Sequence, residues 1–142
     1  MYALDNDALS LFLRRQEPIT SRLLAVPTQA IWLPAVTVEE QLRGRMAFLA
    51  GLNSSRSADS PRVPLAYELL LRTLRELEEF QFLEYDAAAE AFYQSWPAAV
   101  KRLGTRDCRI AVTAIVNGFT VITCNTRHFQ PIPGISAEDW SV

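Results

Sequence analysis

Four short polar segments stand where the sequence pattern predicts the end of a strand or the start of a helix. Their residues are, in chain order, Asp5 and Asp7, Glu39 and Glu40, Asp107, and the run 123–128. Ligands of open α/β sheets bind outside the carboxyl ends of the strands, where residues remote in sequence converge. A carboxylate cluster there is an oxygen-rich site suited to Mg²⁺ or Mn²⁺. The pattern therefore predicts a small metal-dependent enzyme that acts on phosphate esters.

The acids at the N-terminus have a structural alternative. Asp5 could cap the helix that follows it, because Asp is a favoured N-cap residue, but Asp7 could cap that helix as well. An acid directly after a buried strand lies at the mouth of the sheet. We therefore expect Asp5 to be a metal ligand, and Asp7 to be a cap or a supporting group beside the metal.

The other two acidic segments also have structural alternatives. Thr37-Val38-Glu39-Glu40 spells a capping box, in which the Glu40 side chain would accept a hydrogen bond from the backbone N–H of Thr37. The sequence alone leaves that role and metal ligation open. Asp107 could be an acid of the first helical turn, favoured by the helix dipole, with Thr105 as the cap. The presence of the other acids favours a ligand role for Asp107.

Length and composition bound the class of protein. The chain has 142 residues, 49% hydrophobic content and a net charge of −2, which are ordinary for one globular domain. No apolar run approaches the length of a membrane span, and the acidic N-terminus does not resemble a signal peptide. We expect no membrane association and a cytoplasmic location. Cys108 and Cys124 are expected to be buried thiols, since they lack a zinc-type or disulfide pattern.

Strands and helices alternate along the N-terminal half. The pattern predicts a strand over 2–5, a helix over 8–13, a short helix over 19–24, a strand over 31–33 and a helix over 37–52. In the last of these, Leu42, Met46 and Leu49 are spaced to face the core. The stretch 51–64 is rich in Ser and charge, so we expect an exposed, mobile loop there.

The C-terminal half continues the alternation. The pattern first predicts a helix with an apolar stripe formed by Tyr67, Leu70, Leu71, Leu74 and Leu77, and then a strand at 82–83. A helix from the Asp86 cap to Tyr93 and a helix over 107–116, ended by Asn117-Gly118, are expected next. The chain then predicts a strand over 120–123, and an edge strand with a turn within 131–140. This order implies a three-layer α/β fold, with a central, mostly parallel sheet flanked by helices.

Taken together, four motifs resemble those of PIN-domain proteins. They are Asp5 after a short strand, Glu40 four residues before Gly44, Gly-Thr-Arg-Asp-Cys-Arg-Ile-Ala at 104–111, and Val-Ile-Thr-Cys-Asn-Thr-Arg-His-Phe at 121–129. The resemblance covers residues 1–140. With Ile-Pro-Gly at 132–134 and Glu-Asp-Trp at 138–140, the chain is most similar to VapC-type toxins of bacterial toxin–antitoxin pairs.

The resemblance implies a single PIN-like domain over residues 1–142 and an endoribonuclease that hydrolyses RNA phosphodiester bonds with Mg²⁺ or Mn²⁺. Such a metal would supply both an activated water and charge neutralisation on the phosphoryl oxygens. The catalytic and metal-binding acids would be Asp5, Glu40 and Asp107. The resemblance also implies a small VapB-like antitoxin as a partner, and a homodimer formed through helices.

The chain departs from the family pattern at His128, where the family has a further acid. His128 is counted with Asp5, Glu40 and Asp107 among the expected metal-binding residues, and its neutral imidazole favours Mn²⁺, Zn²⁺ or Ni²⁺ over Mg²⁺. The alternative is an ordinary surface or hydrogen-bonded residue, which a lone histidine more often is. A one-metal enzyme, an enzyme with altered metal preference and a degenerate enzyme all remain open. Asn125 could orient a ligand, water or substrate, or form an Asx turn. Arg106 and Arg127 flank the proposed ligands and are the expected phosphate contacts.

Two rival functions follow from the same residues. One is a catalytically weakened PIN-fold module that binds or regulates, with His128 in place of the usual acid. The other is a different metal-dependent phosphoesterase, for example a DNA nuclease, because a sheet and carboxylates alone do not select the polymer.

Overall fold

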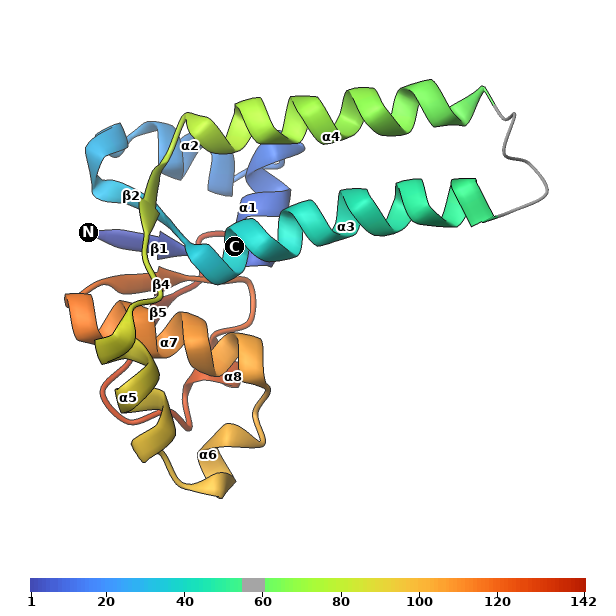
Figure 1. Ribbon diagram of the computed structural model, residues 1–142. Helices are drawn as coiled ribbons and strands as arrows, with labels where there is room; N and C mark the ends of the chain where they lie inside the picture. Colours follow the sequence, from blue (N-terminus) through green and yellow to red (C-terminus); the bar gives the residue numbers. More distant parts are fainter. Residues whose placement is uncertain (55–60) are drawn as a thin grey trace.

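A five-stranded, all-parallel sheet forms the centre of the protein, in a computed structural model that describes residues 1–54 and 61–142. The strands are β1 (Tyr2–Leu4), β2 (Ile31–Pro34), β3 (Gln81–Leu83), β4 (Thr120–Ile122) and β5 (Ser136–Glu138), in the order β3-β2-β1-β4-β5. β1 is central and pairs in parallel with both β2 and β4 (Figure 1). Since the strands are parallel, their carboxyl ends meet at one edge, as the sequence predicted.

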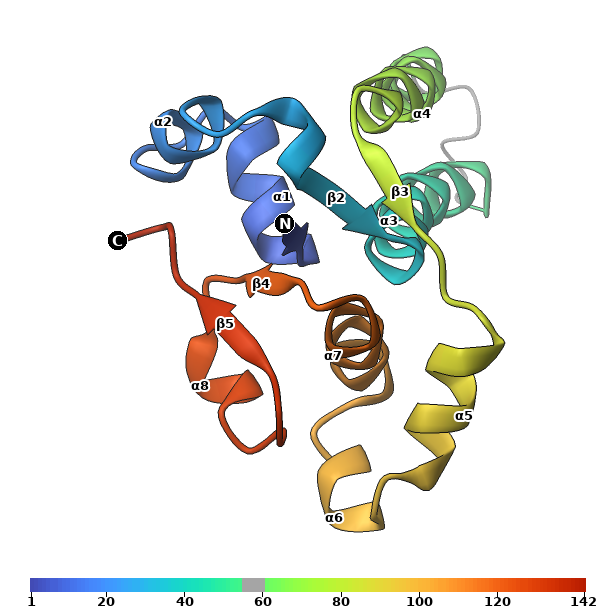
Figure 2. The same cartoon turned by 90° about the vertical axis from the view of Figure 1, so that its left-hand side faces the viewer.

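Helices cover both faces of the sheet (Figure 2). The helices are α1 (Asn6–Leu13), α2 (Ile19–Leu24), α3 (Ala35–Ser54), α4 (Arg62–Glu78), α5 (Ala87–Ser95), α6 (Ala98–Lys101), α7 (Thr105–Asn117) and α8 (Thr126–Phe129), with a short 3-10 turn at Thr28–Ala30. One core joins α1, α2 and the end of α4 to the sheet, around Leu4, Leu33 and Ile122. The second core packs α7 and Phe129 against the opposite face, around Ala3 and Val121. The predicted three-layer architecture is confirmed.

Side-chain alternation in the strands explains the two cores. Ala3 and Leu4 are both fully buried but belong to opposite faces, and so do Val121 and Ile122. Successive side chains of a strand point to opposite sides of the sheet, so a sheet covered on both faces needs continuous apolar runs. Of the two cysteines, Cys108 is buried as predicted, whereas Cys124 is half-buried; both are free.

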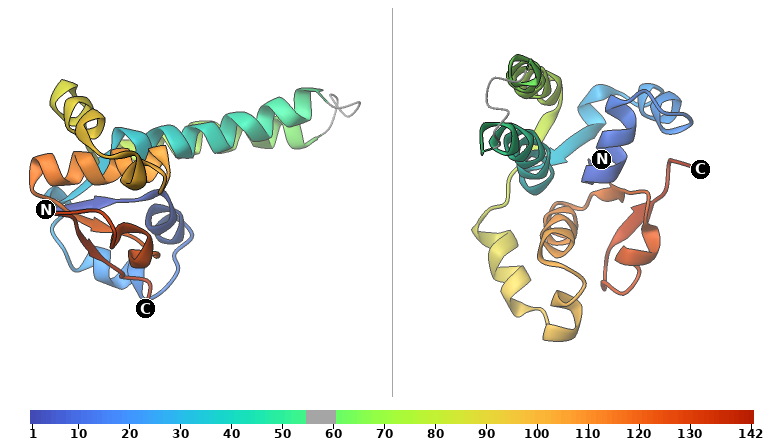
Figure 3. Two further views of the ribbon diagram at one scale, coloured as in Figure 1. Left: turned by 90° about the horizontal axis from the view of Figure 1, so that it is seen from below. Right: turned by 90° about the vertical axis from the view of Figure 1, so that its right-hand side faces the viewer.

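Helices α3 and α4 lie side by side and extend away from the sheet (Figure 3). Because much of this pair has no sheet to pack against, the prediction that Met46 faces the core is wrong, and its side chain is 60% exposed. The predicted stripe of α4 is wrong at Tyr67, Leu71 and Leu74, which are also exposed, whereas Leu77 is buried. The α3–α4 pair therefore carries exposed apolar side chains.

Several predicted boundaries also shift. α3 begins at Ala35, two residues before the predicted start, and continues through 51–54, while α4 already includes 62–64. The predicted loop over 51–64 is therefore helical at both ends, and its middle, 55–60, lies outside the described residues. α8 was not predicted. Among the described residues, no helix combines the length and apolar character needed to cross a bilayer.

Candidate active site

Asp5 lies at the carboxyl end of the central strand, where it also begins α1. Its Oδ1 accepts a hydrogen bond from the backbone N of Ala8 at 2.8 Å, so Asp5 is the N-cap of α1. The residue is only 7% exposed. Burial raises the pKa of Asp5 to about 6; hydrogen bonds with Thr123 and Ala8 oppose this rise, and the charges of Asp7 and Asp107 add to it. Asp5 is therefore both a helix cap and a member of an acidic cluster.

Asp7 does not have the capping role predicted for it. It lies in the first turn of α1, and Asp5 caps the helix instead, so this prediction is wrong. The charge of Asp7 nonetheless contributes to the raised pKa values of Asp5, Glu40 and Asp107. Asp7 thus lies beside the cluster, and its role as a supporting group stays a prediction.

Glu40 is brought to the cluster by the start of α3. The Thr37 hydroxyl is buried and donates to the backbone carbonyl of Leu4 at 2.8 Å, which ties α3 to the end of β1. Because α3 begins at Ala35, Thr37 is inside the helix and the predicted capping box between Thr37 and Glu40 is wrong. The Glu40 side chain is free of that role and reaches the same edge of the sheet as Asp5.

The electrostatics of Glu40 show that the separate acidic segments meet. Burial, followed by the charges of Asp107, Glu39, Asp5 and Asp7, raises the pKa of Glu40 to about 7. Repulsion of this kind acts only between groups that are close, because exposed charges are screened within about 10 Å. Three acids from three distant parts of the sequence are therefore neighbours.

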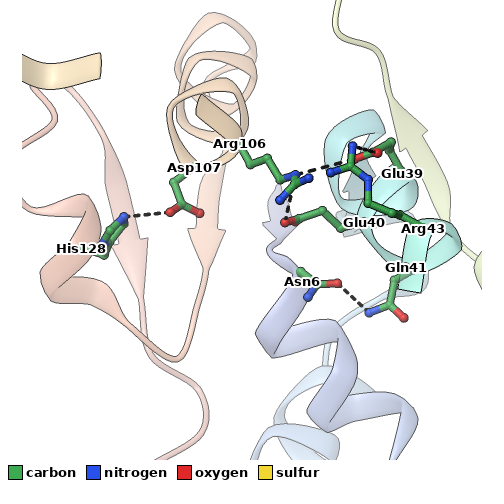
Figure 4. Close-up of polar contacts among 8 residues, drawn as sticks. All are labelled: Asn6, Glu39, Glu40, Gln41, Arg43, Arg106, Asp107 and His128. Atoms are coloured by element: carbon green, nitrogen blue, oxygen red, sulfur yellow. Dashed lines mark hydrogen bonds and ion pairs between the residues drawn. The ribbon is translucent and has the colours of Figure 1, made fainter. Parts of the chain in front are cut away.

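Asp107 occupies the first turn of α7. The N-cap is Gly104, at a φ of 123°, so the predicted Thr105 cap is wrong. Asp107 Oδ2 lies 2.8 Å from His128 Nε2 (Figure 4). Burial raises the pKa of Asp107, the interaction with His128 lowers it, and the charge of Asp7 raises it.

Arg106 spans the gap between α7 and α3. Its Nε lies 3.7 Å from Glu40 Oε1 and 3.9 Å from Glu39 Oε2, and Figure 4 shows the side chain reaching across from one helix to the other. Arg43 also pairs with Glu39, an interaction that their i, i+4 spacing could have indicated. The contacts of Arg106 are long and half-exposed, so they are weak. Burial and then the repulsion from neighbouring acids determine the raised pKa of Glu40.

Asn125 and Arg127 lie on the exposed surface at the start of α8. The backbone N of Asn125 donates to Thr123 Oγ1 at 3.0 Å, whereas the Asn125 side chain makes no capping bond, so the predicted Asx turn is wrong. Among the described residues, no hydrogen bond or ion pair joins either side chain to the acids. Arg127 is thus free to contact a ligand, whereas Arg106 is engaged with Glu39 and Glu40.

The carboxylates are neighbours but do not converge on one point. Within residues 1–54 and 61–142, no three acidic, histidine or cysteine side chains lie close enough together to hold a metal ion as they stand. Asp107 faces His128 and Glu40 faces Arg106, which keeps the two carboxylates apart. Oxygen donors that raise one another's pKa nevertheless fit a hard divalent cation, which would relieve their repulsion.

Comparison with known proteins agrees with this arrangement. The profile of the PIN domain family matches residues 2–134. A curated relative, the tRNA(fMet)-specific endonuclease VapC of Shigella flexneri, is 36% identical over 78 aligned positions, and the match covers 49% of this chain and 59% of the relative. The match therefore spans less than two thirds of that relative's length.

Solved structures share the fold over nearly the whole chain. The DNA-bound VapBC of Salmonella typhimurium is 25% identical with a TM-score of 0.74, and the match covers 98% of this chain and 97% of that one. VapBC-1 of nontypeable Haemophilus influenzae is 20% identical with a TM-score of 0.74, covering 99% and 98%. A toxin–antitoxin complex of Klebsiella pneumoniae is 20% identical with a TM-score of 0.62, covering 95% of each chain.

Proposed function

Because the chain belongs to the PIN-domain family and is similar to its VapC-type members, we propose that it is a metal-dependent endoribonuclease and the toxin of a toxin–antitoxin pair. The observation that carries the proposal is the placement of Asp5 after β1, Glu40 near the start of α3 and Asp107 in the first turn of α7. Burial and then the charges of neighbouring acids, Asp107 and Asp5 among them, raise the pKa of Glu40, in keeping with that placement. That coupling joins three acids from separate segments at the carboxyl edge of a parallel sheet, where ligands of such sheets bind.

Asp5, Glu40 and Asp107 are the residues that would hold Mg²⁺ or Mn²⁺. When bound, the ion would acidify a water and neutralise charge on the phosphoryl oxygens of the substrate. The chain's own residues would then divide the remaining work. His128 would orient the Asp107 carboxylate through its 2.8 Å contact. Asp7 would support the cluster electrostatically, because its charge already acts on all three acids.

The basic and amide side chains around the acids would bind substrate. Arg106 is within reach of Glu40 and would exchange this loose contact for a phosphate, which a guanidinium binds in bidentate fashion. Arg127 and Asn125 are exposed near His128 and would contact the strand on that side. We infer RNA as the polymer because the curated relative is named a tRNA-specific endonuclease. An RNA substrate would place the activity in the cytoplasm.

The proposed partners are a small VapB-like antitoxin and a second copy of this chain. Support comes from the structural relatives, which are VapBC and toxin–antitoxin complexes. It also comes from the exposed apolar side chains of α3 and α4, among them Met46, Leu65, Tyr67 and Leu71. Tyr67 and Leu71 are one turn apart on α4 and share a face of the helix, and an exposed apolar face of this kind marks an interaction site. Size-exclusion chromatography with light scattering would test the homodimer.

Cleavage of matched RNA and DNA oligonucleotides, with Mg²⁺ or Mn²⁺ and with EDTA, tests the enzyme assignment. We expect RNA fragments only when the metal is present, and none from the Asp5→Asn variant. Cleavage of DNA but not RNA would favour the other phosphoesterases. Cleavage that persists in EDTA would contradict metal dependence.

His128 supports one alternative, a catalytically weakened module that binds RNA or a partner. In that case the wild-type chain would neither bind Mn²⁺ nor be stabilised by it, and His128→Asp would restore cleavage. Our proposal expects Mn²⁺ to bind the wild-type chain. Calorimetric titration of both proteins with Mn²⁺ therefore separates the two functions.

A further inference from the structure

Two polar cavities meet at Glu40. The first, of about 330 Å³, lies between α1, α3 and α4; its basic side chains are Arg14, Arg45 and Arg72. We refer to it as the α1 groove. The second, of about 510 Å³, lies between α3 and α7; its basic side chains are Arg43, Arg106 and Arg109. We refer to it as the α7 groove. Glu40 lines both, and Asp107 lines the α7 groove.

From this geometry we propose that a single-stranded oligonucleotide crosses the protein through both grooves, so that its backbone phosphates contact arginines on each side of Glu40. The inference rests on the proposed function for the position of the scissile phosphate. It adds a path for the strand, and a set of arginines in each groove that hold it. Proteins that bind single strands without sequence preference use positively charged grooves that follow the phosphate backbone.

Arg109 lies against two aromatic rings at the α7 groove. Its guanidinium carbon lies 5.4 Å from the ring centre of Tyr85 and 5.7 Å from that of Tyr93, and Tyr85 donates to Glu90 at 2.6 Å. The Arg109 Nε is buried and has no hydrogen-bond partner. A stacked guanidinium loses little further freedom on binding an anion, so Arg109 is suited to a phosphate.

Gly44 makes the α1 groove accessible. It lies in the middle of α3, lines the groove, and a Cβ added there would meet no atom within 4 Å. Glycine inside a helix is destabilising relative to alanine. Nothing in the packing of α3 requires glycine, and its missing side chain leaves the helix backbone exposed to whatever occupies the groove. This observation is independent of the arginines.

The test measures binding without cleavage. A fluorescein-labelled 12-nucleotide single-stranded RNA is titrated with the full chain in EDTA, and anisotropy gives Kd at several salt concentrations. We expect Arg14→Ala and Arg43→Ala each to weaken binding several-fold and to reduce the slope of log K against log salt by about 0.7, the loss of roughly one phosphate contact on a single strand. Arg102→Ala is the matched control, because this exposed residue at the end of α6 lines neither groove.

Two further variants separate the path from a simple charge effect. Gly44→Leu would fill the α1 groove without changing charge, and we expect it to weaken the 12-mer at least ten-fold while the melting temperature stays the same or rises. A dinucleotide has a single bridging phosphate and cannot place one phosphate in each groove, so at least one of Arg14→Ala and Arg43→Ala should leave its Kd unchanged. We expect that millimolar inorganic phosphate does not displace the 12-mer. That result would exclude a site for free phosphate.

Three results would overturn the proposal. Binding of the 12-mer that is as sensitive to Arg102→Ala as to Arg14→Ala and Arg43→Ala would show a diffuse charge effect. If the groove variants weaken the binding of a polyglutamate peptide but not that of the 12-mer, the grooves would belong to an acidic protein partner. Wild-type cleavage that none of the groove variants affects would leave the nuclease in place and remove the path. Groove-dependent binding without cleavage in Mn²⁺ would instead uphold the path and remove the nuclease.

Discussion

His128 Nε2 lies 2.8 Å from Asp107 Oδ2 and 2.7 Å from the backbone carbonyl oxygen of Leu103. Both partners are hydrogen-bond acceptors, so this nitrogen carries the hydrogen and acts as the donor. A nitrogen that donates cannot ligate a metal at the same time. In this arrangement Nε2 donates to Asp107 and does not face a metal position, so the ligand role of His128 stays a prediction and an orienting role for the Asp107 carboxylate becomes its alternative.

Substitutions at His128 should separate orientation from ligation. We expect His128→Ala to lower Mn²⁺ affinity by about 10- to 100-fold, the usual effect of losing a group that orients a ligand. His128→Gln retains an N–H donor and should stay closer to wild type. Titration calorimetry of metal-stripped protein measures both. If His128→Gln and His128→Ala weaken Mn²⁺ binding equally, the hydrogen bond that His128 donates to Asp107 does not determine the Mn²⁺ affinity.

Asp5 combines two roles that a pair of variants can separate. Asn is as good an N-cap as Asp, whereas Ala is not, so Asp5→Ala should destabilise the metal-free protein by about 1 kcal/mol relative to Asp5→Asn. Both variants lack the carboxylate and should lose at least about 100-fold in cleavage, beyond the usual effect of losing a supporting group. Urea unfolding and a fluorescent RNA assay measure the two effects. An active Asp5→Asn variant would contradict the ligand role.

The arrangement of the acids was predictable because it follows from the order of the elements. Apolar runs that end in acids, alternating with helical periodicity, imply a parallel sheet with those acids at one edge. The structure has Asp5 after β1 and Asp107 at the start of α7, as that pattern requires. Local capping signals, such as Asp86 before α5 and Gly118 after α7, were also readable.

Features that depend on tertiary contacts were not predictable. Thr37 looked like an N-cap, but its hydroxyl bonds to the Leu4 carbonyl, so the helix begins earlier. Part of the predicted apolar stripe of α4 is exposed, because periodicity identifies an apolar face without telling what covers it. The pairing of His128 with Asp107 joins residues from α8 and α7, and the sequence carried no signal for α8 as a helix.

The raised pKa values of the acids predict how stability depends on pH. Asp5 and Glu40 have pKa values of about 6 and about 7, above their ordinary values of 3.8 and 4.5. A carboxyl with a raised pKa stabilises the fold fully below its ordinary pKa, and this contribution is lost as the pH rises through the folded value. The two acids should therefore make the metal-free protein progressively less stable between about pH 4 and pH 7.

Mn²⁺ should reverse this loss, because it binds the deprotonated acids. We expect the rise in melting temperature caused by Mn²⁺ to be small near pH 5 and larger near pH 7.5. Scanning calorimetry with Mn²⁺ and with EDTA measures it. The Asp5→Asn/Glu40→Gln double variant is the control and should show little Mn²⁺ effect at either pH. A Mn²⁺ effect that is larger at the lower pH would contradict the prediction.

Thr37 sets the position of Glu40 relative to Asp5, and its removal should affect both stability and metal binding. Thr37→Val keeps the shape of this fully buried side chain but leaves the Leu4 carbonyl without its 2.8 Å donor, so we expect a loss of about 1 kcal/mol in the free energy of unfolding. Because the bond ties α3 to β1, Mn²⁺ affinity should also fall. Thr37→Ser retains the hydroxyl and should preserve that affinity, although it loses a buried methyl group. Urea unfolding and Mn²⁺ titration of both variants measure these effects, and a Val variant with wild-type Mn²⁺ affinity would show that the position of Glu40 does not depend on this bond.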